Sequence, residues 1–493
     1  MITYFRDIQT KKVRKATENY LDNRYFVFKL MKTKYLITTR HRAWIILSEK
    51  DYKLLLNHEV HQNPKLFKIL FALNVIYIKD NTSDAIQQYK NKYSYLKQPP
   101  TLNAIVPTLR CNLKCDYCRS RSGPNIEKKD MSKSLAKKTV DFIFSIPHPS
   151  RKVHIEFQGG EPLLRWDIIK YIIEYTRKKS KKRDFLLPSF SITTNLLLMN
   201  EEIAKDIIDY RKNKISFNIT TSLDGPKEIH DSRRKYPDNK GSYDNVVHWI
   251  DILQKKYKIP LSVISVITQN SLGHEKEIID ELIKHNLINF KFLHVDLIGR
   301  LFDNYQKKKD NLSVSPQEFF NFWKNSLEYI LQLNKRGIKV KEKTIIFLLS
   351  NLLSLKSTYM CIRKPCGAGI SQLEFGCDGT IHACDGGKSV KRLELGNIKT
   401  HAYQDIAMSK TVFRLRSIRS ENLPICSTCP WGPYCGYCVA RGINQHGQFI
   451  PKIPEDYDCQ LYSQIIPYLF KQFLNKEKAK LFSKWVSNLF GDS

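Results

Sequence analysis

Residues 108–118 read Thr-Leu-Arg-Cys-Asn-Leu-Lys-Cys-Asp-Tyr-Cys, in which Cys111, Cys115 and Cys118 have the spacing C-x3-C-x2-C. Three thiolates this close together can ligate three irons of one iron–sulfur cube. The fourth iron is then open to a ligand that is not protein, and an open iron is a place where chemistry can occur. An incomplete zinc site and three ordinary buried thiols are the alternative interpretations of this triplet.

The composition is that of a folded protein, with 493 residues of which 42% are hydrophobic and 11% aromatic. The twelve cysteines are absent from the first 110 residues and gather at 111–118 and 361–459. Clustered cysteines favour clusters or metals over a disulfide scaffold, and therefore a reducing compartment. Residues 1–17 do not resemble a signal or transit peptide, and the longest apolar stretch, 345–355, is too short to cross a bilayer. We therefore expect a cytoplasmic protein with no membrane partner.

The formal net charge is +33, from 81 Lys and Arg against 48 Asp and Glu. A nucleic-acid-binding protein concentrates its basic residues in a stripe with interleaved aromatic residues. Here lysine occurs in almost every segment, which indicates compositional bias. We do not expect nucleic acid as the partner, whereas an acidic peptide is compatible with this charge.

Residues 1–95 form a small α+β segment of their own. Strands are predicted at 25–30, 35–39, 44–47 and 75–78, and helices from Ser48 onward and over 64–73. Two interpretations are open, a structural N-terminal extension and a docking module that binds a peptide. Residues 90–100 are predicted to be the linker to the next domain.

Residues 100–300 alternate short apolar strands with amphipathic helices. Strands are predicted at 103–107, 153–157, 190–194, 215–222, 261–268 and 290–297. Helices are predicted at 132–145, 166–178, 201–210, 243–256 and 275–285. Six β–α repeats with parallel crossovers build most of a barrel, so the predicted class is α/β with a partial (β/α)6 barrel similar to a TIM barrel. Reactive groups of such a barrel project from the C-terminal ends of the strands, and the cysteine triplet lies just past the first strand.

Three further motifs follow later strands of the predicted barrel. Gln158-Gly159-Gly160-Glu161-Pro162 follows the second strand, and its glycines let a backbone approach a ligand without interference from Cβ. Thr193-Thr194-Asn195 follows the third strand, and residues 221–226, Thr-Ser-Leu-Asp-Gly-Pro, follow the fourth, with Arg233-Arg234 shortly after. Each motif alone is typical of a cap or turn. On one rim they line a pocket suited to a carboxylate, an amine and a ribose.

The cysteine triplet, the Gly-Gly-Glu-Pro motif and Ser-Leu-Asp-Gly-Pro together resemble the radical S-adenosylmethionine (SAM) superfamily, in its peptide-modifying branch. The resemblance implies that Cys111, Cys115 and Cys118 hold a [4Fe-4S] cluster whose open iron binds the amino and carboxylate groups of SAM. It also implies that the backbone of the glycine motif meets the methionyl amine and that the other residues meet the carboxylate or ribose. The implied SAM-binding residues are Gly159, Gly160, Glu161, Pro162, Asn195, Ser222 and Arg234.

The same resemblance implies the chemistry. One electron, from a reduced flavodoxin- or ferredoxin-type donor, passes through the cluster and cleaves the sulfonium of SAM. The resulting 5′-deoxyadenosyl radical abstracts a hydrogen atom from the substrate. A largely closed barrel is needed because such a radical must be kept from water and from wrong C–H bonds.

The C-terminal part contains nine cysteines, among them two C-x2-C pairs that in isolation are as typical of a zinc ribbon as of a cluster site. The larger pattern, with Cys366-x12-Gly379-x4-Cys384 ahead of the pairs, resembles the SPASM domain. That domain carries two auxiliary [4Fe-4S] clusters in peptide-maturing radical SAM enzymes. Matching by order implies two ligand sets: Cys361, Cys366, Cys384 and Cys438 for one cluster, and Cys426, Cys429, Cys435 and Cys459 for the other. Cys377 is left over as a buried thiol.

Asp385 directly follows Cys384, as an Asp does in sulfatase-maturing relatives, and this resemblance implies a general base that faces the substrate. A turn-capping role is the alternative. The remaining segments are expected as a helical bridge over 301–358 with helices at 316–336 and 344–357, a SPASM domain over 359–460, and a C-terminal helical segment over 461–493.

Over nearly the full length the chain resembles the His-Xaa-Ser system radical SAM maturase family. This resemblance is carried by 35–39, 47–49, 108–112, 155–164 and 221–226. It implies oxidation or crosslinking of a ribosomally made precursor peptide that contains His-Xaa-Ser repeats. An anaerobic sulfatase-maturing enzyme that makes formylglycine is one alternative, and a non-catalytic, zinc-bearing nucleic-acid-binding protein is the other.

Overall fold

The computed structural model describes residues 16–78, 82–124, 126, 130–307, 311–355 and 359–487. Within these ranges the strands form a ten-stranded sheet, a three-stranded sheet and a two-stranded sheet. The expectation for residues 1–17, and the ends of the predicted helices at 344–357 and 461–493, lie wholly or partly outside the described residues. None of the helices in the described ranges combines the length and apolar character that a membrane span requires.

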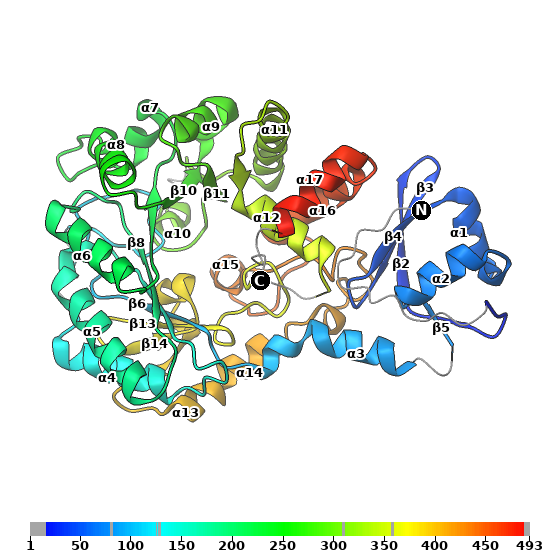
Figure 1. Ribbon diagram of the computed structural model, residues 1–493, viewed down its shortest axis with the longest axis horizontal. Coiled ribbons are helices and arrows are strands. Elements are labelled where there is room, and N and C mark those ends of the chain that lie inside the picture. Colours follow the sequence, from blue (N-terminus) through cyan, green and yellow to red (C-terminus); the bar gives the residue numbers. More distant parts are fainter. Residues whose placement is uncertain are drawn as a thin grey trace.

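The N-terminal sheet has the predicted strands in the antiparallel order β2 (Tyr25–Met31), β3 (Lys34–Thr39) and β4 (Trp44–Ser48). Ser48 begins α1 (Glu49–Leu56) because its side chain accepts a hydrogen bond from the Asp51 amide at 3.2 Å, as its position before the helix predicts. α2 (Pro64–Ala72) follows, and β5 (Ile76–Tyr77) pairs with β1 (Leu21–Asp22). Helix α3 (Thr82–Lys92), which was not predicted, runs from this domain toward the barrel (Figure 1).

Strand β4 is buried on both faces, which ties the N-terminal domain to the rest of the chain. Ile45 and Leu47 pack into the domain's own core with α1 and α2. On the other face the Trp44 ring lies 5.0 Å from that of Phe470, and its indole N–H donates to the Leu352 carbonyl at 2.6 Å. The domain therefore docks on the C-terminal helices, as Figure 1 also shows.

The six predicted barrel strands are present, parallel and neighbours in chain order. They are β6 (Leu102–Ile105), β7 (His154–Phe157), β8 (Ser189–Thr193), β9 (Phe217–Ser222), β10 (Leu261–Ile267) and β11 (Asn289–His294). The connecting helices are α4 (Lys133–Ser145), α5 (Trp166–Lys182), α6 (Glu201–Lys212), α7 (Lys227–Arg233), α8 (Tyr243–Asp251) and α9 (Glu275–Lys284). Ser132 and Asn200 cap α4 and α6 by accepting backbone N–H groups. The partial barrel is therefore built as the alternating pattern predicts, except that α7 is an additional helix that was not predicted.

The central sheet also continues beyond these six strands on both sides. Beside β11 lies the short parallel strand β12 (Lys341–Glu342). Beside β6 lies β13 (Gln372–Phe375), parallel and in register with it, followed by the antiparallel strands β14 (Thr380–His382) and β15 (Glu394–Asn397). The cysteine-rich region thus adds strands to the barrel sheet itself and brings its turns to the strand that precedes the cysteine triplet.

Further helices follow the barrel strands along the chain. Between the barrel and the cysteine-rich region lie α10 (Arg300–Gln306), which was not predicted, then α11 (Pro316–Lys335) and α12 (Lys343–Leu353), which were. The C-terminal region contains α13 (Tyr403–Ala407), α14 (Lys410–Ser417), α15 (Val439–His446), and the predicted final pair α16 (Tyr457–Gln472) and α17 (Lys476–Ser487). Helix α16 packs on α11, with the Phe320 and Tyr468 rings 5.9 Å apart.

Candidate active site

The cysteine triplet lies in the loop that follows β6, and all three of its cysteines are partly buried. Arg300, at the start of α10, fixes this loop by donating to the carbonyls of Cys115 at 2.5 Å and Ser122 at 2.7 Å. The Leu113 amide points at the Cys111 sulfur at 3.4 Å. Burial raises the pKa of the Cys115 thiol to about 12, although Arg234 opposes the increase. A thiol in such surroundings becomes a thiolate most readily when it ligates a metal.

The glycine pair after β7 lies directly against the cysteine loop. A Cβ atom on Gly159, whose φ is +137°, would lie 2.4 Å from the Thr108 carbonyl oxygen, and one on Gly160 would lie 2.0 Å from that of Arg110. The amides of Gly160 and Glu161 donate to these two carbonyls at 3.0 and 2.8 Å. The missing side chains therefore allow two loops to pack backbone to backbone, which is an additional reason for glycine beyond the predicted approach of a ligand.

Glu161 points into the protein and joins the ends of β7 and β8. Its carboxylate accepts hydrogen bonds from the Thr194 hydroxyl at 2.6 Å, the Asn195 amide at 2.8 Å and the Leu163 amide at 3.0 Å. Burial raises the pKa of Glu161 to about 7, against the effect of these hydrogen bonds. Pro162 begins a 3-10 helix, Pro162–Arg165. The carboxylate of Glu161 thus holds the rim together, and what this motif can offer a ligand is its backbone.

Arg234 is buried and already has a carboxylate partner. Its Nε and Nη2 donate to Asp224 at 2.9 and 3.2 Å, and the Tyr117 hydroxyl donates to the same carboxylate. Burial would raise the pKa of Asp224, but Arg234 and His230 bring it below its ordinary value. Asp224 belongs to the Ser-Leu-Asp-Gly-Pro motif but had no predicted role of its own. The ion pair forms across ten residues of chain, and no local pattern indicates it.

These motifs surround one cavity of about 220 Å³ at the C-terminal ends of the barrel strands. Its wall contains the three cysteines, every predicted SAM-binding residue except Pro162, and Asp385. The predicted residues that line it are Cys111, Cys115, Cys118, Gly159, Gly160, Glu161, Asn195, Ser222, Arg234 and Asp385. Asn195 also donates to the Asn112 side chain at 2.8 Å, which links the loop after β8 to the cysteine loop. The sequence-predicted residues are therefore brought together on one rim.

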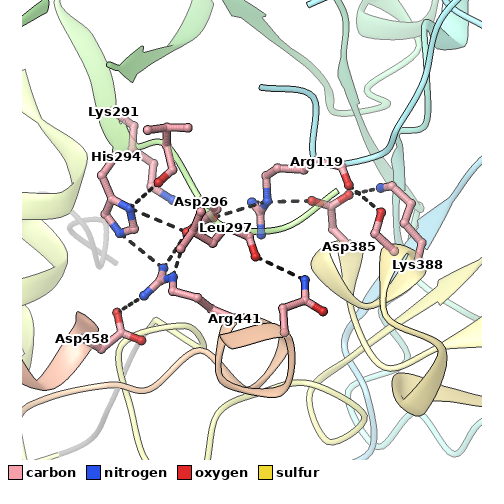
Figure 2. Close-up of polar contacts among 12 residues, drawn as sticks. Arg119, Lys291, His294, Asp296, Leu297, Asp385, Lys388, Arg441 and Asp458 are labelled. Atoms are coloured by element: carbon pink, nitrogen blue, oxygen red, sulfur yellow. Dashed lines mark hydrogen bonds and ion pairs between the residues drawn. The ribbon is translucent and has the colours of Figure 1, made fainter. Parts of the chain in front are cut away.

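Asp385 is the start of a chain of ion pairs that leads away from the cavity (Figure 2). The carboxylate of Asp385 pairs with Lys388 and lies 3.8 Å from Nη1 of Arg119. Arg119 in turn lies 3.4 Å from Asp296. Burial would raise the pKa of Asp385, but Lys388 and Arg119 lower it overall. Asp385 is thus held as a carboxylate, and it is the first residue of a 3-10 helix, Asp385–Ser389, that follows Cys384.

The chain of ion pairs continues to the cysteine-rich region. Arg441, on α15, donates to Asp296 at 2.6 Å and to Asp458 at 2.7 Å. Asp458 accepts the backbone N–H of Cys438 at 2.7 Å. His294, at the end of β11, lies 3.3 Å from Arg441, so residues from five segments meet in this network (Figure 2). None of the network residues Arg119, Asp296, Arg441 and Asp458 was predicted as a site residue.

The remaining cysteines lie in two groups. Burial raises the pKa of Cys384, and charge on Cys366, Cys438 and Cys361 raises it further. Burial raises the pKa of Cys459 to about 12, with further contributions from Cys435, Cys426 and Cys429. Cys377 is buried, and Asp378 is the charged group that contributes most to its raised pKa. The thiols that influence one another are those that the SPASM resemblance places in the same set.

A buried lysine contacts two thiols of the second group. The Lys364 ammonium, on a residue 8% exposed, lies 3.3 Å from the Cys426 sulfur and 3.2 Å from the Cys435 sulfur. Burial lowers the pKa of Lys364, but the two cysteines raise it above its ordinary value. Among the described residues no three His, Cys, Asp or Glu side chains converge as ligands of a single ion would.

Comparison with known proteins agrees with this geometry. A family model described as the radical SAM superfamily matches residues 105–286, and one described as an iron–sulfur cluster-binding domain, SPASM, matches residues 366–430. The chain belongs to the radical SAM superfamily and carries a SPASM domain. It is an enzyme of the α/β class that uses SAM and [4Fe-4S] clusters. Membership excludes the alternative of a non-catalytic zinc protein.

Three similar proteins illustrate the relationship. The cysteine-type anaerobic sulfatase-maturating enzyme of Clostridium perfringens is 25% identical over 389 residues, which are 76% of this chain and 98% of that protein. The subtilosin biosynthesis protein AlbA of Bacillus subtilis is 26% identical over 69% of this chain and 67% of its own length. The solved structure of native anSMEcpe with bound AdoMet and Cp18Cys peptide has a TM-score of 0.64 and 25% identity, and the match covers 76% of this chain and 99% of that one.

Proposed function

We propose that this enzyme reductively cleaves SAM and uses the resulting radical to oxidise or crosslink a ribosomally made precursor peptide of the His-Xaa-Ser type. The observation that carries the proposal is the cavity at the strand ends, because it joins the three-cysteine loop to the glycine motif, Asn195, Ser222, Arg234 and Asp385. The substrate class is supported by the likeness to AlbA, which is named for the biosynthesis of a bacteriocin. The His-Xaa-Ser assignment is supported by the sequence motifs alone.

On the cofactor side of the cavity we assign each residue a role. Cys111, Cys115 and Cys118 would ligate the SAM-binding cluster, and the backbone at Gly159 and Gly160 would contact the methionyl amine of SAM. SAM bound to a reduced cluster supplies a carbon radical that abstracts hydrogen. Ser222, Asn195 and Arg234 would position the carboxylate or ribose of SAM. Asp224 uses Nε and Nη2 of Arg234, which leaves Nη1 of that guanidinium for a carboxylate.

On the substrate side, Asp385 would accept the proton that the substrate releases when its radical is oxidised. The carboxylate lines the cavity and is held ionised by Lys388 and Arg119, as a proton acceptor must be. The electron released in the same step would go to auxiliary clusters. We assign Cys361, Cys366, Cys384 and Cys438 to one of these and Cys426, Cys429, Cys435 and Cys459 to the other.

We also propose that the enzyme works in the cytoplasm with a reduced flavodoxin- or ferredoxin-type protein as electron donor. The support is chemical, since none of the twelve cysteines is in a disulfide and cluster thiolates need a reducing compartment. The N-terminal domain would bind the precursor peptide, because it is a separate small domain docked beside the catalytic one.

Anaerobic reconstitution tests the proposal. The purified enzyme should bind about twelve irons, as three four-iron clusters require. It should release 5′-deoxyadenosine from SAM when reduced. Coexpression with a short His-Xaa-Ser repeat peptide should change the mass of that peptide, as mass spectrometry would detect. Binding of about four irons, or no 5′-deoxyadenosine, would contradict the proposal.

A second candidate function is the maturation of an anaerobic sulfatase. It is favoured by the C. perfringens relative, because the match covers 98% of that sulfatase-maturating enzyme. The two candidates differ in substrate. Formylglycine in a coexpressed sulfatase peptide, together with an unmodified His-Xaa-Ser peptide, would decide for the second candidate.

A further inference from the structure

A second cavity lies beside the end of β11. Its volume is about 300 Å³, and its walls come from the residues after β11, the start of α11, and helices α15 and α16. This volume is at the lower end of the range for small-molecule sites, and it has room for one amino-acid side chain. None of the predicted site residues lines it.

Asp296 lies between this second cavity and the SAM-binding cavity. Its two carboxylate oxygens pair with two guanidinium groups, that of Arg119 at 3.4 Å and that of Arg441 at 2.6 Å (Figure 2). Arg119 lines the SAM-binding cavity, and Arg441 lines the second one. In an extended peptide, residues two positions apart are separated by about 7 Å. A peptide that places one side chain in the second cavity therefore presents its near neighbours to the SAM-binding cavity.

The second cavity contains a carboxylate that has no cation. Glu318 lines it and accepts hydrogen bonds at Oε2 from the Ser315 amide at 2.8 Å and the Gln269 side chain at 3.3 Å. Hydrogen bonds from Ser315 and Gln269 lower the pKa of Glu318, so it is ionised at neutral pH. In the part of the chain that the structure describes, no lysine or arginine pairs with it, although the net charge is +33. The negative charge of Glu318 is thus left for a ligand.

The rest of the lining favours a ring. Val295 and Val314 are buried, and Leu297 and the Tyr457 side chain complete the apolar wall. Arg441 adds little net charge, because it is paired with two carboxylates. A ring with apolar faces and an N–H group on its edge fits such walls, since the faces contact the apolar side chains and the N–H donates to the carboxylate. Imidazole meets this description, and it has an N–H group whether it is neutral or protonated.

We propose that the second cavity binds the histidine side chain of a His-Xaa-Ser unit in the precursor peptide, with Glu318 accepting an imidazole N–H. The histidine then anchors the peptide while its neighbours reach the SAM-binding cavity. The inference rests on the substrate class of the proposed function, and it adds which part of the substrate is recognised and by which residue. Glu318 is thereby a specificity-determining residue.

The test is peptide binding to the reconstituted full-length enzyme, measured by the fluorescence anisotropy of two labelled synthetic peptides. One contains a single His-Ala-Ser unit, and in the other phenylalanine replaces the histidine, which keeps a ring but removes the N–H. The wild type should bind the histidine peptide about tenfold more tightly, as expected for a hydrogen bond to a charged group. In Glu318→Gln the preference should fall to about threefold or less, because a neutral hydrogen bond is weaker. The affinity for the phenylalanine peptide should not change.

Two controls separate recognition from folding. Glutamine serves as well as glutamate at this position of a capping box, so Glu318→Gln keeps the start of α11. Its release of 5′-deoxyadenosine from SAM without peptide should therefore equal that of the wild type. Glu228→Gln changes an exposed glutamate in the first turn of α7, outside the linings of both cavities, and should keep the full preference for histidine.

The alternative results are distinct. An equal preference for histidine in the wild type and in Glu318→Gln would overturn the inference, and so would a wild type that binds both peptides alike. Weaker binding of both peptides by Glu318→Gln would also overturn it, because the residue would then act on the fold and not on the histidine. If the wild type modifies the histidine peptide in these cases, the proposed function stands. A wild type that cleaves SAM but never modifies the histidine peptide would contradict the proposed function, whatever the binding shows.

Discussion

Replacement of Glu161 by glutamine should change how the stability of the barrel depends on pH. The Glu161 carboxylate is buried between β7 and β8, and burial raises its pKa from the ordinary value of 4.5 to about 7. Glutamine has nearly the same shape but cannot ionise. The side-chain N–H group of glutamine would face one of the three donors to the carboxylate, on Asn195, Thr194 or Leu163. The loss of that hydrogen bond should lower the folding stability by about 1–3 kcal/mol at any pH.

Proton binding decides the direction of the pH effect. Between pH 4.5 and about 7 the folded protein keeps a proton on Glu161 that the unfolded chain has released, so stability falls as the pH rises through this window. From pH 6 to pH 8.5 the loss for such a shift is about 1.4 kcal/mol. For a domain of 150–250 residues this corresponds to a decrease in Tm of roughly 3–6 °C. The glutamine variant should lack this decrease.

Thermal unfolding of wild type, Glu161→Gln and Glu228→Gln at several pH values between 6 and 8.5 measures the effect. Glu228 is an exposed glutamate on α7 and is the matched control. The control should follow the wild-type curve, while Glu161→Gln should start lower and vary less with pH. A Glu161→Gln curve parallel to the wild type would refute the reasoning, because the carboxyl would then titrate alike in the folded and unfolded chains.

Three further changes have defined outcomes. Gly159→Ala places a Cβ 2.4 Å from the Thr108 carbonyl oxygen and should remove about four irons per chain. The control Gly337→Ala, at a residue with φ +90° and nothing within 4 Å, should keep its iron and lose only about 1 kcal/mol of folding stability. Iron analysis distinguishes the two variants, and a full iron content in Gly159→Ala would contradict the packing argument. Asp385→Asn should slow peptide modification about 100-fold or more, measured by mass spectrometry of the peptide. Cleavage of SAM, measured as release of 5′-deoxyadenosine, should continue, and loss of both reactions would point to a structural role instead. Trp44→Phe removes the hydrogen bond to the Leu352 carbonyl and should lower the folding stability by about 1–3 kcal/mol. Limited proteolysis should then release the N-terminal domain more easily, and an unchanged digestion pattern would count against this docking contact.

The barrel could be predicted from the sequence because its strands are short apolar runs separated by amphipathic helices. The spacing of apolar residues along a strand or helix indicates which of its faces is buried. Each strand and each helix can therefore be recognised from its own stretch of sequence. Ser48 is another example, because a helix-capping side chain accepts a hydrogen bond from an amide only three residues further along the chain. The cysteine spacing and the glycine motif are local as well, and they led to the residues that line the cavity.

The features that escaped prediction depend on partners far apart in the chain. Arg119 reaches Asp296, and Arg441 joins Asp296 to Asp458, so no window of sequence contains the network. The orientation of Glu161 is of the same kind, because only the folded rim brings Thr194 and Asn195 to its carboxylate. Charged residues in a chain with 81 Lys and Arg look alike until the fold decides which of them are buried.

The pairing of β13 with β6 has a consequence for the independence of the two regions. Residues 372–375 protect the edge of the strand that leads into the cysteine triplet. A fragment that ends before β13 would expose that edge, and an exposed edge strand invites pairing with another chain. The barrel and the cysteine-rich region are therefore expected to fold as one unit. A chimera that takes the cysteine-rich region from a relative would also need a β6 strand that pairs with the β13 strand of that region.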